Sequence, residues 1–501
     1  MRIVFAASEV APYSKTGGLG DVIGALPRAL DALGEKVVVF SPLYTQVRDN
    51  ARERGLPLKK RANLSFSVPI GDFQVAAHLV EGKLPDSGVT VYFLENDEYY
   101  DRPGLYTNPA DGSDYQDNCE RFTFLCRGAM EACKALGLTP DIIHCNDWQT
   151  GLIPVYLSRI YREDFPAAAS IFTVHNIAYQ GLFWRWDMST TGLPWDLFNW
   201  KMLEYYGNLS FLKGGLVFSD ALTTVSRQYA KELQTEEYGM GMQGVVKTRV
   251  ADLYGIVNGV DYDTWRPETD RDIARNYSIE DLSGKKECKR ALQAEFKLPQ
   301  DESAPLIGMI GRLVDQKGFD LVVAALPEMV KRNAQLVALG TGEAKYHQLL
   351  TDMVEKLPGK VGVYLGFDEK LAHRIEAGAD MFLMPSRFEP CGLNQLYSLR
   401  YGTVPIVSAT GGLVDTVVDY SEAADEAGEA TGFVFRPDSV QELIKGVDRA
   451  VWVYRKKPDT WTQLQQRGMK QDWSWNRSAQ EYQQVYKKAV LRVQNGVSAP
   501  K

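Results

Sequence analysis

The sequence predicts an α/β protein of two doubly wound domains, each a parallel sheet covered by helices. The chain has 501 residues, more than one hydrophobic core usually supports, so two domains are expected. Short β-branched runs alternate with segments of helical spacing, which is typical of the strand-helix-strand units of parallel sheets. This alternation pauses after about residue 260 and restarts near residue 300.

The first domain is expected at residues 1–260 and begins with a strand-helix-strand unit. "RIVFAA" is a short apolar run, residues 21–33 have helical spacing that ends at Gly34, and "KVVVFSP" is a second buried run. A crossover of this kind joins two parallel strands of one sheet. Further strands are predicted at "VTVYFLE", "DIIHC", "SIFTVHN", "ALTTVS" and "YGIVNGVD".

The second domain is expected at residues 261–476 and starts with a charged stretch, residues 262–300, for which we expect irregular structure. Its strand and helix pairs are "PLIGMIGRL" with "GFDLVVAALPEMVKR", "QLVALGTG" with "AKYHQLLTDMVEKL", "VGVYLGF" with "EKLAHRIEAG", "DMFLMPS" with "GLNQLYSLRYG", and "VPIVSATGG" with "LVDTVVDYS". Residues 477–501 include "SAQEYQQVYKKAVLRVQ", a polar-faced helix that we expect to pack back on the first domain.

Composition and charge exclude several classes of protein. A content of 45% hydrophobic and 24% charged residues is typical of a globular chain, and a net charge of -8 argues against a general nucleic-acid-binding surface. No apolar run approaches the roughly 18 residues of a membrane span. The six cysteines form no CxxC pair, which favours reduced thiols. We therefore expect a cytoplasmic protein without nucleic-acid or membrane partners.

Polar and glycine residues follow the predicted strands, at the edge where open α/β sheets bind their ligands. A local basic site there suits a phosphorylated substrate, in spite of the negative net charge. The residues concerned are Lys15, Gly17, Gly18, Gly20, Asp147, His175, Asn176, Arg312, Lys317, Glu389, Cys391, Gly411 and Gly412.

Six strings spread over almost the whole chain carry a resemblance to a known family. "KTGGLGDV", "FTVHNIAYQG", "NGVD", "GRLVDQKG", "SRFEPCGL" and "TGGLVDTV", in this order, resemble glycogen synthase and its plant relative starch synthase. The resemblance implies the GT-B fold, in which two Rossmann-like domains face each other across a cleft. It also implies transfer of glucose from ADP-glucose to the non-reducing end of an α-1,4-glucan, with retention of anomeric configuration and no cofactor.

The resemblance also implies roles for charged residues. Lys15 and the glycine amides approach the sugar diphosphate, and Arg312 and Lys317 neutralise charge on the leaving diphosphate. His175 contacts the transferred glucose through its ring or its backbone carbonyl, and Glu389 orients that glucose. The catalytic set is Glu389, His175, Lys317, Arg312 and Lys15; the donor-binding set is Lys15, Gly17, Gly18, Asp21, Asp147, Asn176, Asn258, Phe367, Cys391, Gly392 and Leu393.

Two positions depart from the family pattern, and several roles stay open. Asn146 stands where many bacterial relatives have a histidine, and Tyr397 stands where related retaining enzymes have a second glutamate, so a two-glutamate mechanism is not available. Asp147 and Asn258 either contact sugar hydroxyls or serve turns and caps. Phe367 either stacks on adenine or is a buried aromatic. The tryptophan-rich residues 183–206 either line an acceptor path or belong to the core.

Two further patterns suggest other functions. Asp261-Tyr262-Asp263 has the D-x-D form that holds a metal in a different glycosyltransferase fold, but it follows "IVNG" at a turn, and we expect no metal site. A nicotinamide-dependent dehydrogenase needs its glycines directly after the strand, whereas about nine residues separate Ala7 from Gly17. A glucan-binding protein without activity is the third alternative, and it predicts loss of Lys15, Lys317 or Glu389, all of which are present.

Overall fold

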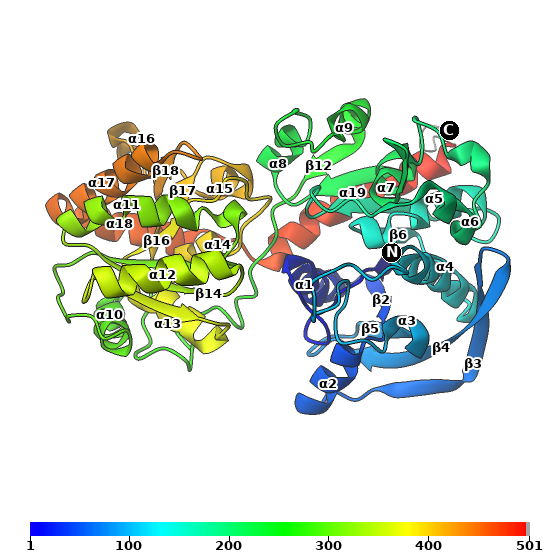
Figure 1. Ribbon diagram of the computed structural model, residues 1–501, viewed down its shortest axis with the longest axis horizontal. Helices are drawn as coiled ribbons and strands as arrows, with labels where there is room; N and C mark the ends of the chain where they lie inside the picture. The colour runs from blue at the N-terminus through cyan, green and yellow to red at the C-terminus, as the bar shows by residue number, and fades with distance from the viewer. Residues whose placement is uncertain (497–501) are drawn as a thin grey trace. The chain divides into compact units, whose positions relative to one another are not determined.

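The computed structural model describes residues 1–496, the side chains of residues 62 and 63 excepted. The chain divides into two compact units (Figure 1). The first unit comprises Met1–Val225, Ala230–Gly259 and the C-terminal segment from Trp475, and the second comprises Ser226–Tyr229 and Val260–Ser474. The crossings at 259/260 and 474/475 lie one or two residues from the expected boundaries at 260/261 and 476/477.

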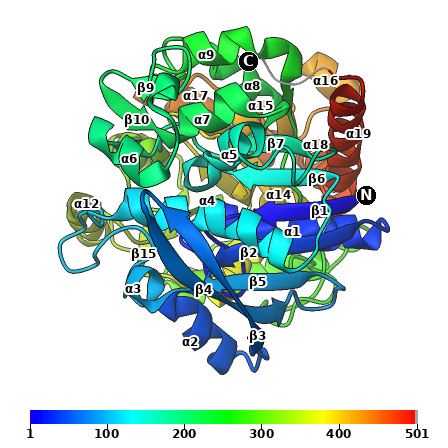
Figure 2. The same cartoon turned by 90° about the vertical axis from the view of Figure 1, so that its right-hand side faces the viewer.

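The first unit contains a nine-stranded sheet in the order β12-β11-β7-β6-β1-β2-β5-β4-β3. It is parallel from β12 to β5, while β4 and β3 add an antiparallel hairpin at the edge. Figure 2 shows β1, β2, β5 and β4 following one another across it. The strands are β1 (Arg2–Ala6), β2 (Lys36–Pro42), β3 (Lys59–Ile70), β4 (Phe73–Lys83), β5 (Thr90–Glu95), β6 (Ile142–Asn146), β7 (Ala169–Val174), β11 (Ala221–Thr224) and β12 (Leu253–Gly255).

A second, three-stranded antiparallel sheet, β8-β10-β9, and short helices follow β7 in the first unit. The small strands are β8 (Leu182–Phe183), β9 (Glu204–Tyr205) and β10 (Asn208–Ser210). The helices are α1 (Gly18–Ala32), α2 (Thr45–Glu53), α3 (Asp97–Tyr100), α4 (Asn118–Ala135), α5 (Ile153–Arg159), α6 (Met188–Thr191), α7 (Phe211–Phe218), α8 (Arg227–Glu232, which begins in the second unit), α9 (Gln243–Thr248) and α19 (Trp475–Gln494), with 3₁₀ turns η1 (Trp148–Thr150), η2 (Arg185–Asp187), η3 (Trp195–Leu197) and η4 (Val250–Asp252).

The C-terminal helix α19 lies against α1 and β7 of the first unit. Tyr486 of this helix is fully buried, and its hydroxyl lies 2.7 Å from His144 Nδ1 on β6. The other ring nitrogen of His144 lies 2.6 Å from Thr173 Oγ1 on β7. Burial lowers the pKa of His144 to about 3, so this neutral imidazole joins α19 to the sheet through hydrogen bonds and ring contacts and not through charge.

The second unit is a six-stranded parallel sheet in the order β15-β14-β13-β16-β17-β18. Numbered along the chain this order is 3-2-1-4-5-6, the doubly wound arrangement of dinucleotide-binding folds. Its elements are α10 (Ser283–Glu295), β13 (Leu306–Ile310), η5 (Asp315–Lys317), α11 (Phe319–Lys331), β14 (Gln335–Gly340), α12 (Ala344–Lys356), β15 (Val361–Leu365), α13 (Glu369–Gly378), β16 (Met381–Met384), α14 (Asn394–Arg400), β17 (Val404–Ser408), α15 (Gly411–Thr416), α16 (Glu422–Glu426), β18 (Phe433–Phe435), α17 (Val440–Lys456) and α18 (Pro458–Lys470).

Alternate residues of these strands face two separate apolar clusters, one on each side of the sheet. Leu336 and Ala338 of β14 join α11, α12, α17 and α18, whereas Val337 and Leu339 join α10, α13 and α15. Both faces are therefore covered, which is why the strands appear in the sequence as continuous apolar runs. In the part of the chain that the structure describes, no helix is long and apolar enough to cross a bilayer.

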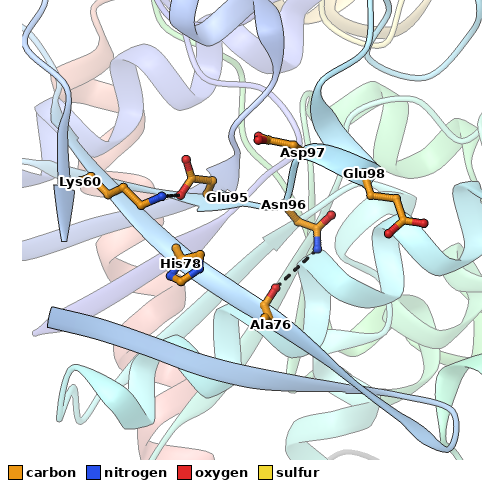
Figure 3. Close-up of a pocket in the computed structure, with 7 residues that line it drawn as sticks. All are labelled: Lys60, Ala76, His78, Glu95, Asn96, Asp97 and Glu98. Atoms are coloured by element: carbon orange, nitrogen blue, oxygen red, sulfur yellow. Dashed lines mark hydrogen bonds and ion pairs between the residues drawn. The ribbon is translucent and has the colours of Figure 1, made fainter. Parts of the chain in front are cut away.

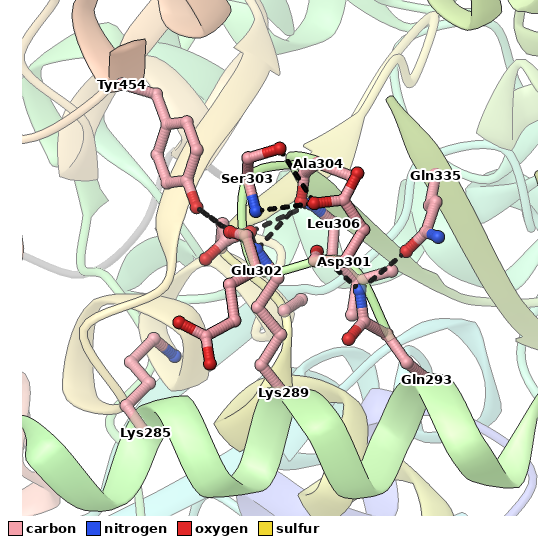
Figure 4. Close-up of polar contacts among 12 residues, drawn as sticks. Lys285, Lys289, Gln293, Asp301, Glu302, Ser303, Ala304, Leu306, Gln335 and Tyr454 are labelled. Atoms are coloured by element: carbon pink, nitrogen blue, oxygen red, sulfur yellow. Dashed lines mark hydrogen bonds and ion pairs between the residues drawn. The ribbon is translucent and has the colours of Figure 1, made fainter. Parts of the chain in front are cut away.

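The expectation of irregular structure over residues 262–300 is wrong in part, because α10 lies inside it. Two lysines of this helix are buried and hide its apolar periodicity. Lys289 Nζ donates to the carbonyl oxygens of Glu302 (2.9 Å) and Ala304 (2.7 Å) and pairs with Asp380, and Figure 4 shows it pointing from α10 to that backbone. Lys285 Nζ donates to Thr403 Oγ1 at 2.6 Å, and burial lowers its pKa to about 8.

Candidate active site

In the second unit, two loops meet at the point where the strand order reverses. The chain winds outward from β13 through β14 to β15 and returns to β16, which pairs with the other side of β13. Residues 311–318 follow β13, and residues 385–393 follow β16. Ligands of open α/β sheets bind at such a switch point, and six of the predicted site residues lie on these two loops.

Glu389 and Lys317 form a close ion pair across the two loops. Lys317 Nζ lies 2.5 Å from Glu389 Oε2, and Ser386 Oγ donates to the same carboxylate oxygen at 2.9 Å. Glu389 is buried, with 6% of its surface exposed, and Lys317 is half-buried. The pair therefore has one defined geometry, with a carboxylate and an ammonium held side by side at the strand ends.

Further hydrogen bonds fasten one loop to the other. Gln316 Nε2 donates to the carbonyl oxygen of Phe388 at 2.9 Å, and the backbone N–H of Arg387 donates to the carbonyl oxygen of Gln316 at 2.9 Å. The Arg387 guanidinium also pairs with Asp320 (2.7 Å) and Asp438 (2.8 Å). The 2.5 Å contact between Lys317 and Glu389 is thus part of a rigid assembly.

Three glycines let neighbouring backbones approach this assembly. Gly318 has φ +68°, and a Cβ there would overlap the carbonyl oxygen of Pro385. A Cβ at Gly411 would overlap the carbonyl oxygen of Glu389, and one at Gly412 would overlap that of Cys391. Only glycine fits at these three positions. The two glycines of "TGG", Gly411 and Gly412, therefore allow α15 to pack closely under the loop that carries Glu389.

The remaining predicted residues of this unit occupy different environments. Cys391 is buried, Gly392 has φ +71°, and Leu393 precedes α14. Arg312 is exposed on the loop after β13. Phe367 follows the edge strand β15, away from the switch point, and is 81% exposed, so the buried alternative is wrong for it.

Tyr397, at the position of the family's second glutamate, has a structural partner. Its ring stacks on Trp265 at 3.9 Å between centroids, and Trp265 stacks on His373 at 3.9 Å on its other face. His373 Nδ1 in turn lies 2.7 Å from the Asp270 carboxylate. Tyr397 therefore fixes the segment that carries Trp265 and Asp270 onto the second unit.

In the first unit, the glycine loop after β1 is organised by Glu9, which sequence reasoning missed. The Glu9 carboxylate accepts hydrogen bonds from the backbone N–H groups of Thr16 (2.6 Å) and Gly17 (3.2 Å) and from the Tyr106 hydroxyl (2.6 Å). Glu9 is 3% exposed. An acidic residue directly after a buried strand is the signal that would have identified it, because such a carboxylate needs partners.

Lys15 and Asp21 lie at the start of α1, which begins at Gly18 and not at residue 21 as expected. Gly17 is the extended N-cap, and Gly18 and Gly20 belong to the first turn, because glycine tolerates both the loop and the helix. Lys15 Nζ lies 2.6 Å from Asp21 Oδ1, and both side chains are partly exposed. Lysine and glycines therefore meet at a helix N-terminus, a location that favours anions.

Asp147 and His175 follow the adjacent strands β6 and β7. The backbone N–H of His175 donates to Asp147 Oδ1 at 2.7 Å, and His175 Nε2 lies 3.0 Å from Asn146 Oδ1. Burial raises the pKa of Asp147 to about 7 and lowers that of His175 to about 3. His175 is thus a neutral imidazole, with Asn146, the departure noted in the sequence, as its partner.

The two asparagines of the predicted donor set differ. Asn176 Oδ1 accepts a hydrogen bond from the backbone N–H of Ala178 at 3.0 Å, which is a local turn contact. Asn258 is 6% exposed, and among the described residues its Oδ1 has no hydrogen-bond partner. A buried acceptor of this kind suits a ligand donor better than a cap.

Two other features lie outside the predicted catalytic and donor-binding residues. Asp261 Oδ1 accepts a hydrogen bond from the Asp263 backbone N–H at 3.0 Å, a turn contact within the D-x-D pattern. A polar pocket of about 400 Å³ lies on β3, β4 and β5, and no predicted site residue lines it (Figure 3). Its lining residues are Lys60, Ala76, His78, Glu95, Asn96, Asp97 and Glu98.

Comparisons with known proteins agree along both halves of the chain. Residues 2–248 match the family described as starch synthase catalytic domain, and residues 292–463 match glycosyl transferases group 1. A glycogen synthase of Anaeromyxobacter sp. (strain Fw109-5) is 48% identical over 97% of this chain and 99% of its own length. A glycogen synthase of Koribacter versatilis is 47% identical over 98% of both chains.

Solved structures show the same fold. The catalytic domain of starch synthase IV from Arabidopsis thaliana, bound to ADP and acarbose, superposes with a TM-score of 0.89 at 31% identity, over 98% of this chain and 99% of that one. Sucrose-phosphate synthase from Thermosynechococcus elongatus gives a TM-score of 0.59 at 18% identity over 97% and 98% of the two chains, which supports the fold alone. The chain therefore belongs to the glycogen synthase and starch synthase family and is a glycosyltransferase with the GT-B fold.

Proposed function

We propose that this enzyme transfers glucose from ADP-glucose to the non-reducing end of an α-1,4-glucan, with retention of anomeric configuration. Family membership makes its substrates a nucleotide sugar and a glucan. ADP as the nucleotide is supported by the similar starch synthase IV structure, which is bound to ADP.

The observation that carries the proposal is the pair of Lys317 and Glu389 at the switch point of the second unit. Glu389 is buried beside the Lys317 ammonium, and this pairing holds its carboxylate at the loop where we place the sugar. We assign to it the orientation of the glucose and the stabilisation of positive charge at C1. Lys317 and Arg312, together with Lys15 of the first unit, neutralise the leaving diphosphate.

In the proposed step, the bond from C1 to the β-phosphate oxygen breaks while a bond forms from the acceptor O4 to C1. The acceptor approaches on the face from which the diphosphate leaves, and the departing phosphate oxygen takes the O4 proton. No covalent glucosyl intermediate on the enzyme is needed, and Tyr397 provides no second carboxylate for one. His175, neutral at pH 7, serves as a hydrogen-bonding partner of the glucose.

We further propose that the reaction needs no metal or other cofactor, since lysine and arginine supply the positive charge. We place the enzyme in the cytoplasm. All six cysteines are buried free thiols, which supports a reducing compartment.

The test is incorporation of labelled glucose into glycogen by the purified protein, from ADP-glucose and from UDP-glucose in parallel. We expect kcat/KM to be at least tenfold higher with ADP-glucose. Equal use of the two donors, or transfer from UDP-glucose alone, would overturn the donor assignment.

A further inference from the structure

Ser226 follows β11 and begins a short segment, Ser226–Tyr229, that belongs to the second unit. The serine is fully buried, and its Oγ donates a hydrogen bond to the carbonyl oxygen of Pro390 at 2.6 Å. Pro390 directly follows Glu389 in the loop after β16. A residue 164 positions earlier in the chain than Pro390 therefore contacts the backbone of the loop that carries Glu389.

The Ser226 hydroxyl has a partner for its oxygen as well as for its proton. It accepts a hydrogen bond from the backbone N–H of Tyr229 at 3.0 Å, which is the contact of a helix N-cap at the start of α8. Because this contact holds the oxygen in place, the proton is directed at the Pro390 carbonyl. Alanine at position 226 would remove both hydrogen bonds from a buried site.

A second hydrogen bond joins the same segment to α15, the helix that packs under the loop. The backbone N–H of Gln228 donates to Asp415 Oδ2 at 2.9 Å. At the start of α15, the backbone N–H of Gly412 donates to the carbonyl oxygens of Glu389 (3.1 Å) and Pro390 (3.2 Å). The segment, α15 and the Glu389 loop thus form one hydrogen-bonded assembly within the second unit.

The carbonyl is the one backbone group through which Pro390 can be held by hydrogen bonds. Proline has no backbone N–H, and its ring already restricts φ. The Pro390 carbonyl oxygen accepts one hydrogen bond from Ser226 and one from Gly412, which uses both of its lone pairs. These bonds constrain the peptide planes on both sides of Pro390, and with them the backbone from which the Glu389 side chain projects.

A capping role alone does not explain a serine at position 226. A cap needs an acceptor only, and aspartate serves as well as serine there. The Pro390 carbonyl needs a donor, and a buried carboxylate beside it would be unfavourable. The Ser226 hydroxyl therefore suits the loop as well as the helix. Its bond restrains Glu389 from the backbone, while Lys317 Nζ (2.5 Å) and Ser386 Oγ (2.9 Å) hold the carboxylate.

We propose that Ser226 is a positioning residue for Glu389, and that its hydrogen bond to Pro390 keeps the Glu389 carboxylate where positive charge develops on the transferred glucose. The inference rests on the proposed function for the role of Glu389. Ser226 acts through the backbone of the loop and contacts no substrate. Because a misplacement of about 1 Å costs about a hundredfold in rate, the loss of this restraint should be measurable.

The first experiment is a kinetic cycle of Ser226→Ala, Glu389→Gln and the double variant with ADP-glucose and glycogen. We expect Ser226→Ala to lower kcat about tenfold or more and to leave the affinity for ADP-glucose within about threefold of the parent. In the Glu389→Gln background the same substitution should change kcat by less than about twofold, since a residue that acts through Glu389 has nothing left to position. An equal loss in both backgrounds, or near-normal kcat in a folded Ser226→Ala protein, would overturn the proposal.

Ser421→Ala is the matched control for the loss of a cap. Ser421 Oγ accepts a hydrogen bond from the Ala424 backbone N–H at 3.1 Å at the start of α16 in the same unit, and this variant should keep the parent's kcat. Asp415→Ala is the second variant, at a half-buried site, and it removes the acceptor of the Gln228 N–H. It should lower kcat about threefold, again only where Glu389 is present. Parent-like kcat in Asp415→Ala together with an unfolded Ser226→Ala protein would overturn the proposal.

Amide hydrogen exchange separates this inference from the proposed function, because it needs no activity. Ser226→Ala should speed exchange in peptides that cover residues 386–393 and 411–416, and Ser421→Ala should not. Faster exchange together with normal transfer by Glu389→Gln would support the restraint on the loop and refute the role proposed for Glu389. Unchanged exchange in a folded Ser226→Ala protein would overturn the restraint itself.

Discussion

The side chains of Lys317 and Glu389 depend on each other, because Glu389 is buried and the half-buried Lys317 ammonium is the cation beside it. Removing one partner of such a pair leaves the other charge uncompensated. Under the proposed mechanism, Lys317→Ala removes a cation from the leaving diphosphate and also disturbs Glu389. We expect turnover to fall by about a hundredfold or more, the scale of losing one transition-state donor.

Steady-state kinetics with ADP-glucose and glycogen test this, with circular dichroism to verify folding. Lys331→Ala should behave like the parent chain, because Lys331 is exposed and its ion pair in the described structure is with Glu328 of its own helix. A folded Lys317→Ala protein with near-normal turnover would contradict the role given to the pair.

The ionisation of Asp147 leads to a prediction about how the stability of the protein depends on pH. Burial raises its pKa from 3.8 to about 7 in the folded protein, so between these values the folded state holds a proton that the unfolded state has lost. Its contribution to stability is present at low pH and declines as pH rises toward 7, by at most about 1.4 kcal/mol per pH unit. Asp147→Asn keeps an acceptor for the His175 N–H and cannot titrate.

Urea unfolding at pH 5 and pH 7.5 measures this contribution. The parent chain should lose more stability between the two pH values than Asp147→Asn does. Asparagine has the size and shape of aspartate, so it adds no new steric conflict to the backbone at this position (φ 55°, ψ −179°), and the variant should fold. Identical pH dependence in both proteins would show that Asp147 is ionised across the whole range.

At the scale of the elements, α15 sits under the Glu389 loop because Gly412 has no side chain. In Gly412→Ala the new Cβ would overlap the carbonyl oxygen of Cys391, so loop or helix must move. We expect a loss of about 1–3 kcal/mol in the stability of the second unit, the usual cost of overpacking, together with lower turnover.

Thermal unfolding of Gly412→Ala and of Gly311→Ala tests this steric argument. A Cβ at Gly311 would meet only the Lys317 side chain, at 3.9 Å, so this variant should retain the parent's stability. Equal melting temperatures for Gly412→Ala and the parent chain would contradict the close packing of "TGG" on the Glu389 loop.

The parallel strands and their helices were predictable because burial on both faces makes each strand a continuous apolar run. The features that were not predicted include the β3–β4 hairpin, helix α10 and the start of α1. The β3–β4 hairpin has one exposed face and weaker patterning, α10 buries Lys285 and Lys289 where apolar residues are expected, and α1 starts three residues early on glycines. In each case a polar or small residue occupies a position where the hydrophobic pattern of the sequence predicts an apolar residue or a different boundary.

For the site, sequence order alone places Lys317 and Glu389 after strands, but their 2.5 Å contact depends on the pairing of β13 with β16. Glu9 was not predictable from a motif, since its role comes from accepting the N–H groups of Thr16 and Gly17. Neighbouring strands bring such residues together, and that adjacency is a property of the fold.

For the whole molecule, the proposed mechanism uses protein cations in both units and no metal. Transfer rates in excess EDTA should therefore equal those with added magnesium or manganese. Loss of activity in EDTA, restored by manganese and abolished in Asp261→Asn, would show that the D-x-D segment holds a metal after all.

The most direct test of the account is the separation of binding from turnover in Glu389→Gln. If Glu389 acts mainly on the charge that develops at C1, calorimetry should find ADP-glucose affinity within about tenfold of the parent, while kcat falls by about a hundredfold or more. Intact mass during turnover should show no glucosyl adduct on the parent protein. A mild loss of kcat, or a trapped glucosyl group on Glu389, would contradict the mechanism.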